Sequence, residues 1–461
     1  MHEDSPREFA AAGARREEKG AGLRVVTSPM IFVHLSDLHL DQQPLGSVFD
    51  VDADLRAMVE NDISEALMQI GRADGVLVTG DIAFSGHSAE YDKAQVWLDR
   101  LTQTIGCDSE RVWTVPGNHD VDRSVLSAYP TIRERHDRVR RCDVAGIPAE
   151  LRVGLTSDTP TVLAPLENYV AFASAYSCEI TPQQPFWRVE MPLGSGRALI
   201  LCGLTSPLIS GASDDNNANR LALGKFQALI PYRPSDVVVT LCHHPTDWLR
   251  DYEEVATYLD ARARLQLFGH KHDLRMQRVD DSVKVHAGAL HPERGPGWDP
   301  HYNIISIEPS QIGATITIYP RKWYRETCAF GADYAPSGEQ WRRYELPLAP
   351  VSAAPALPPA HLEAAGLLPQ DVEATQPLVE SPVRVLANGL GRLSYLTLLA
   401  LGSRLGLTGA DDRRLRSVEL LNLLIRRADE AGQLGVLWDE TSCHVEGMAL
   451  KANPYRGGKD R

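Results

Sequence analysis

The sequence predicts an α/β fold with a small helical domain at its C-terminal end, and three observations carry this prediction. Five runs of β-branched residues and leucine each end in aspartate, asparagine or histidine, as strands of an open α/β sheet do beside a site. Apolar residues at helical spacing separate these runs, first between Leu55 and Ile70. A Pro/Ala-rich stretch at 347–361 then precedes two Leu-rich helical patterns. The chain of 461 residues is long enough for one large domain and one small one.

Polar side chains of the kinds that bind metals follow each of the five predicted strands. In chain order they are Asp37 and His39, then Asp81, then Asn118, His119 and Asp120, then His243 and His244, and finally His270 and His272. In IFVHLSDLHL, the period of two puts Asp37 and His39 on the same side of the chain. In RVWTVPGNHDVD, Pro-Gly ends the strand just before Asn118. An isolated Asn-His-Asp triplet is usually a turn, but five such strand ends in one chain predict a shared site.

The types of side chain in this set indicate metal chemistry. Two aspartates, one asparagine and four histidines offer oxygen and nitrogen donors without a thiolate. Such a set suits Zn, Mn or Fe and argues against an iron–sulfur cluster or a structural cysteine-zinc site. Seven ligands are too many for one tetrahedral ion and fit two ions that share a bridge. Two ions about 3.5–4 Å apart clamp a phosphoryl group while a metal-bound hydroxide attacks in line. We therefore expect two divalent metal ions and hydrolysis of a phosphoester, most simply a phosphodiester.

The order D-x-H, G-D, G-N-H-D, H and G-H-x-H resembles the calcineurin-like metallophosphoesterase superfamily over about residues 30–347. The resemblance implies a four-layer α/β/β/α sandwich. It also implies two ligand sets, one of Asp37, His39 and His272 with Asp81 bridging, the other of Asp81, Asn118, His243 and His270. His119 would then protonate or hydrogen-bond the leaving oxygen, and Asp120 would orient the His119 ring.

The segment after the second strand, GDIAFSGHSAEY at 80–91, is similar to the pattern G-D-x-x-x-x-G-x-x-x-E-Y of the cyclic-nucleotide phosphodiesterase branch of that superfamily. Within it, His87 is a candidate substrate-binding residue, with an exposed residue in the first turn of a helix as the alternative. His244 is the second candidate for contact with the substrate.

The segments between and after the motifs complete the expected fold. Residues 123–185 are an insertion with a charged helical pattern at 133–143 and an amphipathic one at 165–176, and we expect a cap that selects substrate. Residues 186–206 predict a hairpin that turns at 194–196. Four further strand patterns complete a two-sheet core, at 275–279, 283–290, 302–308 and 314–324.

Composition changes along the chain predict its division into domains. The predicted parts are a disordered tail at 1–29, a phosphoesterase domain at 30–346, a linker at 347–382 and a helical domain at 383–461. Met30 directly precedes the first strand and is a candidate translation start, with an N-terminal interaction tail as the alternative. The Leu-rich patterns at 391–407 and 414–437 resemble the effector-associated domains, death-like adaptors of bacterial conflict proteins. An unrelated helical bundle is the alternative, and in the first case residues 383–461 would bind a protein partner.

Charge and cysteine usage narrow the function. The net charge is −14, although residues 382–461 are mildly basic, so the rest of the chain repels long polyanions. Nucleic acid is therefore expected only as a substrate. The seven cysteines form no CxxC pair, and no apolar run reaches the roughly 18 residues that span a bilayer, so we expect a cytoplasmic protein without a membrane segment.

Three functions remain open at this point. The first is a small-molecule or cyclic-nucleotide phosphodiesterase. The second is a nuclease effector of a bacterial defence system, recruited through its C-terminal domain. The third is a non-catalytic scaffold, and the complete ligand set together with His119 counts against it.

Overall fold

The computed structural model describes most of the chain between residues 28 and 351 and parts of the C-terminal region. The described residues are 28–41, 45, 50, 52–211, 220–290, 299–310, 312–351, 386, 389–390, 393, 395–409, 417–444 and 453–456. The predictions for the tail at 1–27 and for most of the linker, 352–382, lie outside these residues.

A seven-stranded mixed sheet forms one half of the core. Its strands are β1 (Met30–Leu35), β2 (Gly75–Val78), β3 (Val112–Thr114), β10 (His301–Pro309), β11 (Gly313–Tyr324), β12 (Ala329–Ala332) and β13 (Arg342–Pro347). The order is β12-β11-β10-β1-β2-β3, with β13 paired to β11. Strands β1, β2 and β3 are parallel, whereas β10 joins β1 antiparallel. The continuous apolar runs of the parallel strands are explained by burial on both faces.

A six-stranded sheet forms the other half. Its strands are β4 (Phe186–Gly194), β5 (Arg197–Leu204), β6 (Val237–Cys242), β7 (Leu265–Phe268), β8 (Arg275–Val279) and β9 (Ser282–His286). The order is β4-β5-β6-β7-β9-β8, in which β5, β6, β7 and β9 are parallel. The predicted hairpin is confirmed as β4 and β5, with Ser195 and Gly196 at its turn. Strand β9 ends at His286, four residues before the predicted end.

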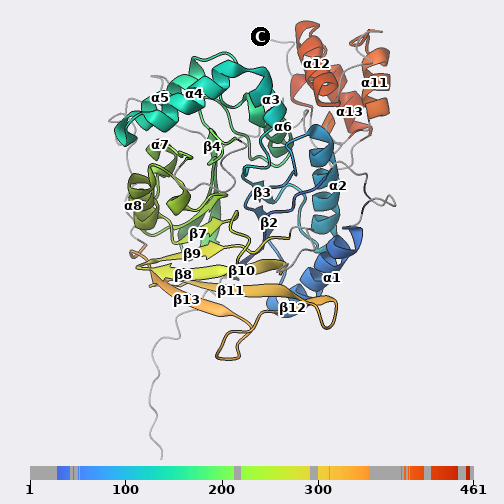
Figure 1. The fold of residues 1–461 in the computed structure, drawn as a ribbon. Helices are drawn as coiled ribbons and strands as arrows, with labels where there is room; N and C mark the ends of the chain where they lie inside the picture. Colours follow the sequence, from blue (N-terminus) through green and yellow to red (C-terminus); the bar gives the residue numbers. More distant parts are fainter. Residues whose placement is uncertain are drawn as a thin grey trace, which may run out of the picture.

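Helices cover the outer face of each sheet, and the predicted α/β/β/α architecture is confirmed. Helices α1 (Ala53–Ile70) and α2 (Ser88–Thr104) lie on one side of the molecule and α7 (Lys225–Ala228) and α8 (Tyr252–Arg262) on the other, with both sheets between them (Figure 1). Helix α1 buries Leu55, Val59, Ile63 and Leu67, which recur at the i, i+4 spacing that the sequence shows.

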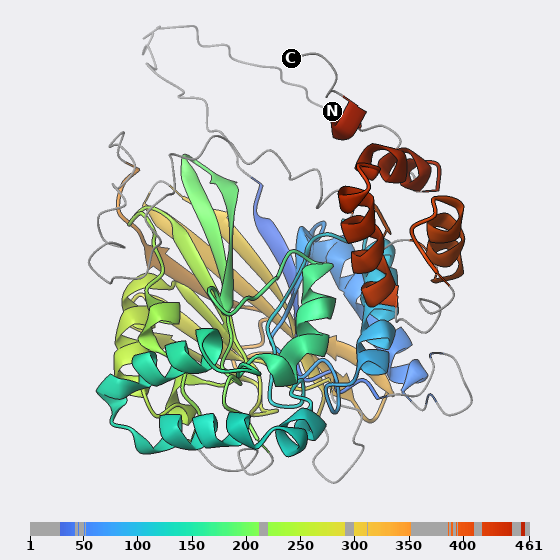
Figure 2. The same ribbon diagram turned by 90° about the horizontal axis from the view of Figure 1, so that it is seen from above.

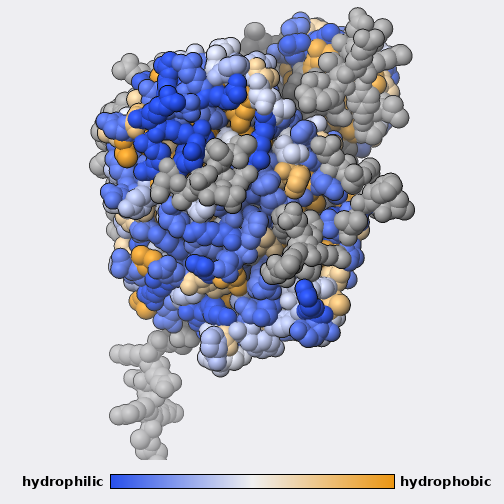
Figure 3. All heavy atoms as spheres, viewed as in Figure 1, coloured by the Kyte–Doolittle hydropathy of each residue, from blue (hydrophilic) through white to orange (hydrophobic). Residues whose placement is uncertain are grey.

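The insertion at 123–185 folds as helices that lie across one end of the two sheets (Figures 1 and 2). They are α3 (Arg123–Ala128), α4 (Pro130–Arg141), α5 (Ile147–Thr156) and α6 (Glu167–Ser174), with 3₁₀ turns η1 (Val144–Gly146) and η2 (Ala164–Leu166). Arg135 of α4 pairs with Glu150 and Asp158 and so ties α4 to α5. The exposed surface over α4 and α5 is strongly hydrophilic (Figure 3). The cap meets the motif loops, because Asn168 Nδ2 donates to Gly86 O at 2.9 Å.

The described C-terminal helices have an apolar core of their own. They are α11 (Tyr395–Arg404), α12 (Ser417–Glu430), α13 (Leu434–Ser442) and the turn η5 (Pro454–Arg456). Leu398, Leu401, Leu424, Leu437 and Trp438 are buried together. Helix α12 ends just before Gly432 at φ 65°, where the sequence pattern predicts a helix end, and α13 follows it. In the described part of the chain, no helix combines the length and apolarity that crossing a membrane requires.

Candidate metal centre

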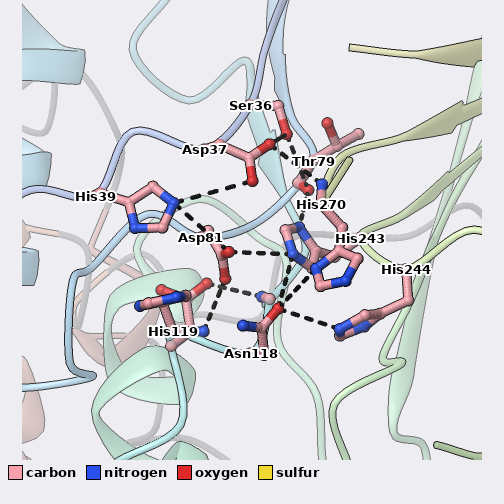
Figure 4. Close-up of polar contacts among 12 residues, drawn as sticks. Ser36, Asp37, His39, Thr79, Asp81, Asn118, His119, His243, His244 and His270 are labelled. Carbon is pink, nitrogen blue, oxygen red and sulfur yellow. Dashed lines mark hydrogen bonds and ion pairs between the residues drawn. The ribbon is translucent and has the colours of Figure 1, made fainter. Parts of the chain in front are cut away.

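Residues that follow strands of both sheets converge on one site (Figure 4). Asp37, Asp81 and Asn118 follow β1, β2 and β3, while His243 and His270 follow β6 and β7. Parallel strands of one sheet end at the same edge, which is why ligands distant in sequence meet here. The structure therefore brings together all seven candidate ligands that the sequence predicts, with His119 and His244 beside them.

The first group of ligand atoms gathers around Asp37. His272 Nε2 lies 3.1 Å and His39 Nε2 lies 3.9 Å from Asp37 Oδ1. His39 Nε2 is also 3.7 Å from Asp81 Oδ2, so Asp81 lies between the two groups. The ligand atoms of Asp37, His39 and His272 all lie within 4.8 Å of one another, a spacing that one cation can close.

The second group gathers around Asn118. The nearest ring nitrogens of His243, His244 and His270 each lie 3.1 Å from Asn118 Oδ1. His243 Nε2 is also 3.2 Å from Asp81 Oδ2. One carboxamide oxygen thus faces three imidazoles, and one carboxylate connects this group to the first.

The protonation of His243 tests whether a cation fits between these atoms. Nδ1 of His243 donates to Thr79 O at 2.8 Å, so in the neutral ring Nε2 carries a lone pair. That lone pair faces two other acceptors, Asp81 Oδ2 and Asn118 Oδ1. Burial is the largest single influence and lowers the pKa of His243, but the charge and hydrogen bond of Asp81, the charge of Asp37 and the bond to Thr79 O together outweigh it and raise the pKa to about 9. In the metal-free protein a proton thus occupies the place where a cation fits, and the donor set suits a divalent metal.

Backbone conformation marks the same residues. Nine described residues other than glycine have positive φ, and five of them are candidate ligands: Asp37, His39, Asp81, His270 and His272. Such conformations cost about 1–3 kcal/mol each and are retained where the surrounding structure requires them. The motif glycines give the ligands room: a Cβ on Gly117 would lie 2.1 Å from Asp81 Oδ1, and one on Gly269 would lie 2.3 Å from Ser36 Oγ.

The structure corrects the role expected for Asp120. Its fully buried carboxylate accepts hydrogen bonds from the N–H groups of Gly117 and Ala83, at 2.8 and 2.9 Å, and from Tyr91 Oη at 2.9 Å. Burial and the nearby charge of Asp81 raise the pKa of Asp120 to about 6. Asp120 thus joins the loop after β2 to the loop after β3, and its described contacts are not with the imidazole it was expected to orient.

A backbone carbonyl orients the His119 ring instead. His119 Nδ1 donates to Phe84 O at 2.9 Å, which leaves Nε2 as its remaining nitrogen. The backbone N–H of His119 donates to Asp81 Oδ1 at 2.8 Å and fixes the base of the side chain. The ring is half-buried, and its centroid lies 4.5 Å from that of His39. His119 therefore remains the candidate proton donor of the site.

The two candidate substrate-binding histidines lie in different surroundings, and His87 lies at the start of a helix, the position that its alternative assignment gave. His244 is 1% exposed, so its ring has no surface for substrate. Ser206 Oγ accepts from the His244 N–H at 3.2 Å and lies 2.8 Å from His244 Nδ1; in the tautomer in which Nδ1 accepts from this hydroxyl, Nε2–H donates to Asn118 Oδ1 at 3.1 Å. His244 therefore holds the Asn118 carboxamide. His87 occupies the N-cap of α2, where its N–H donates to Glu90 Oε2 at 2.9 Å.

The pattern at 80–91 has a physical explanation in the same loop. Glu90 accepts from Ser85 N and Ser85 Oγ, at 3.0 and 2.6 Å, as well as from His87. The Tyr91 hydroxyl donates to the Asp120 carboxylate. Gly86 has a φ of 75°, and a Cβ at this position would lie only 2.7 Å from the backbone nitrogen of Asp122 in the next motif. The glycine, glutamate and tyrosine of the pattern fix the loop that carries Asp81.

Several residues at the site have no counterpart among the predicted ones. Ser36 Oγ donates to Asp37 Oδ2 at 2.5 Å. Its position directly before the D-x-H motif is the one sequence feature that could have indicated this contact. Ser206 has no motif that marks it. Two aromatic rings, Phe84 and Trp248, border the imidazoles, with Trp248 in the 3₁₀ turn η3 (Thr246–Trp248).

A four-layer α/β/β/α sandwich with candidate metal ligands after strands of both sheets is the arrangement expected of a metallophosphoesterase. The family model for calcineurin-like phosphoesterases matches residues 30–274 of the 461 in the chain. The chain belongs to the calcineurin-like phosphoesterase family.

The similar proteins of known sequence match this chain over only a small part of their own length. The cAMP/cGMP dual specificity phosphodiesterase of Mycobacterium tuberculosis is 37% identical over 103 residues, which are 22% of this chain and 29% of that protein. The uncharacterized metallophosphoesterase-like protein YydB of Bacillus subtilis is 32% identical over 94 residues, 20% of this chain and 18% of YydB. Among solved structures, the sulfate thiohydrolase SoxB from Thermus thermophilus has 14% identity and a TM-score of 0.28, covering 70% of this chain and 58% of SoxB.

Proposed function

We propose that the protein is a metal-dependent phosphodiesterase that hydrolyses small phosphodiesters at this site. One observation carries the proposal: seven oxygen and nitrogen donors from two sheets converge with several of their acceptor atoms facing one another. Asp37, His39 and His272 would hold one divalent ion, Asn118, His243 and His270 the other, with Asp81 shared. Ions bound there would polarise the phosphoryl group and make water more acidic.

The chain's own residues supply the remaining chemistry. The hydrogen bond to Phe84 O keeps His119 Nδ1 protonated, so the proton available for transfer is on Nε2 of the imidazolium. In hydrolysis, the oxygen of water forms a bond to phosphorus while the bond from phosphorus to the leaving oxygen breaks. The leaving oxygen takes the proton of His119 Nε2, and the proton lost by water passes to solvent. Asp120 and His244 act on this step only by holding the loops and the Asn118 side chain.

Charge and local sequence favour a small diester as substrate. The net charge of −14 disfavours a long polyanion in the absence of a compensating groove. The loop pattern at 80–91 is typical of cyclic-nucleotide phosphodiesterases, and the M. tuberculosis relative of that name is 37% identical over its matched region.

A second candidate function is a nuclease effector that is recruited through residues 383–461. The separate apolar core of α11 to α13 supports it, because a module with its own core can fold and bind a partner without the catalytic part. In this proposal residues 30–346 are the catalytic domain and residues 347–382 are the linker.

The test compares substrates on one preparation. The full chain, loaded with Mn²⁺, is assayed on bis(4-nitrophenyl) phosphate, cyclic nucleotides, plasmid DNA and single-stranded RNA. We expect turnover of the first two and none after chelation. Protein that holds two ions per chain and turns over no phosphoester would overturn the proposal, and cleavage of nucleic acid alone would favour the nuclease.

A further inference from the structure

We propose that Phe84 forms a subsite that stacks a flat aromatic group of the substrate, such as a nucleobase or an aryl ring, on the leaving-group side of the metal centre. This inference rests on the phosphodiesterase function proposed above and names the chemical class of its substrate.

The position of the Phe84 ring is the first argument. Its centroid lies 5.8 Å from that of His119 and 6.3 Å from that of His39. The residue is nevertheless 47% exposed, so it is not packed into the core although its ring lies beside the two imidazoles. An exposed phenylalanine alone needs no explanation, but one in contact with both the candidate acid and a candidate ligand borders the reacting group.

The rigidity of the loop is the second argument. The Phe84 N–H donates to Leu40 O at 3.1 Å, and Phe84 O accepts from His119 Nδ1 at 2.9 Å. The preceding residue, Ala83, forms a parallel bridge with Leu40 and also donates to Asp120. Since the backbone is fixed on both sides, only two side-chain torsions remain, and a ligand loses little entropy by ordering them.

The direction of proton transfer assigns the subsite to the leaving group. Phe84 holds His119 through Nδ1, so the proton donor and the aromatic ring belong to one local unit. The oxygen that takes the proton from Nε2 departs on this side of phosphorus, and the group attached to that oxygen passes next to Phe84. In a cyclic nucleotide the leaving oxygen belongs to the nucleoside itself, so the base remains within reach of the ring.

A second aromatic residue borders the opposite side of the cluster. The half-buried ring of Trp248 has its centroid 4.6 Å from that of His270, which belongs to the Asn118 group of ligands. The imidazoles are thus flanked by Phe84 on the side of His119 and by Trp248 on the side of His270. An aromatic lining at both ends suits a ligand that has planar rings as well as a phosphate.

The experiment compares ligands with and without a base on matched variants. AMP and ribose 5-phosphate are titrated as competitive inhibitors of bis(4-nitrophenyl) phosphate hydrolysis by the full chain with Mn²⁺. The variants are Phe84→Ala, Phe84→Leu, which keeps apolar bulk, and Phe84→Tyr, which keeps the ring. Tyr129→Ala, which removes an exposed aromatic side chain at the start of α4, is the control. Bound metal is measured in every variant.

We expect Phe84→Ala to raise the inhibition constant of AMP by about 5- to 100-fold, the range for loss of a base stacked on an aromatic ring. The inhibition constant of ribose 5-phosphate should change by no more than about twofold. Phe84→Leu should resemble alanine, whereas Phe84→Tyr and Tyr129→Ala should resemble the native protein. An equal loss for both ligands, or a fall in kcat at unchanged KM and unchanged inhibition constants, would mean that Phe84 only supports His119 and would overturn the inference. Failure of the phosphodiesterase proposal is distinguishable, because the native protein would then hydrolyse none of the diesters.

Discussion

Replacing Asp120 with asparagine separates two roles for this residue, support of the loops and orientation of the His119 imidazole, the proposed proton donor. Gly117 N, Ala83 N and Tyr91 Oη donate to its carboxylate at 2.8 to 2.9 Å, and Ile82 N at 3.3 Å. An asparagine keeps only one acceptor oxygen. Its NH₂ group replaces the other oxygen and cannot accept, so the N–H or O–H groups that face it lose their acceptor. Two unpaired buried donors cost about 1–3 kcal/mol each, so Asp120→Asn should destabilise the fold by about 2–6 kcal/mol.

The assay is urea unfolding of the full chain at pH 8 with metal removed, followed by tryptophan fluorescence. Tyr91→Phe is the matched control, because it removes one donor and leaves the carboxylate bonded to the others, at a cost of about 0.5–1.5 kcal/mol. If Asp120→Asn unfolds like the native chain while its kcat falls as far as that of His119→Ala, the loop-support role is refuted and Asp120 acts on the imidazole.

Three further predictions concern the acid, the cap and the C-terminal helices. His119→Ala should keep its metal and lose about 10²–10⁴-fold in kcat, whereas Asp81→Ala should lose metal; equal metal contents of the two purified variants would contradict the assigned roles. Burial and the charge of Arg140 lower the pKa of His136 in α4 to about 3, so the unfolded chain binds a proton that the folded chain refuses. The stabilisation from neutral His136 is therefore present above about pH 6.5 and is lost by about 1.4 kcal/mol per pH unit as the pH falls toward 3. His136→Leu should reduce this dependence of the unfolding free energy on pH, measured by urea unfolding between pH 6.5 and 4.5. Residues 1–350 alone should give a folded, metal-binding phosphodiesterase, and an insoluble or metal-free fragment would mean that the C-terminal helices complete the catalytic domain.

The fold and the meeting of the motif loops could be predicted from sequence because each depends on local patterns. The run before Asp37 reads as a strand, Pro-Gly ends the strand before Asn118, and parallel strands bring such ends together. Position along a strand, however, does not say which acceptor a side chain will meet. Asp120 directly follows His119 in sequence, yet its carboxylate binds the N–H groups of Ala83 and Gly117, because the loops cross there.

His243 and His244 show the same limit more sharply. Both follow β6 as a pair of identical residues, and adjacent side chains at a strand end point in different directions. The strand pattern alone does not tell which of them faces Asp81; only the family resemblance assigned His243, whose Nε2 lies 3.2 Å from Asp81 Oδ2. The contact of buried His244 with Ser206, a residue with no motif around it, is likewise not marked by the pattern.

The late position of β10 in the chain has a consequence for synthesis. In the seven-stranded sheet β10 lies directly against β1, and the paired residues His34 and Asn303 are 269 positions apart. A growing chain that has passed His272 already carries every candidate ligand, but β1 still has an open edge. Unpaired edges invite association with other chains, and contacts of long sequence separation form slowly. The nascent chain of roughly 300 residues therefore exposes a strand edge that the complete sheet covers, and we expect it to associate with other chains more readily than the folded protein does.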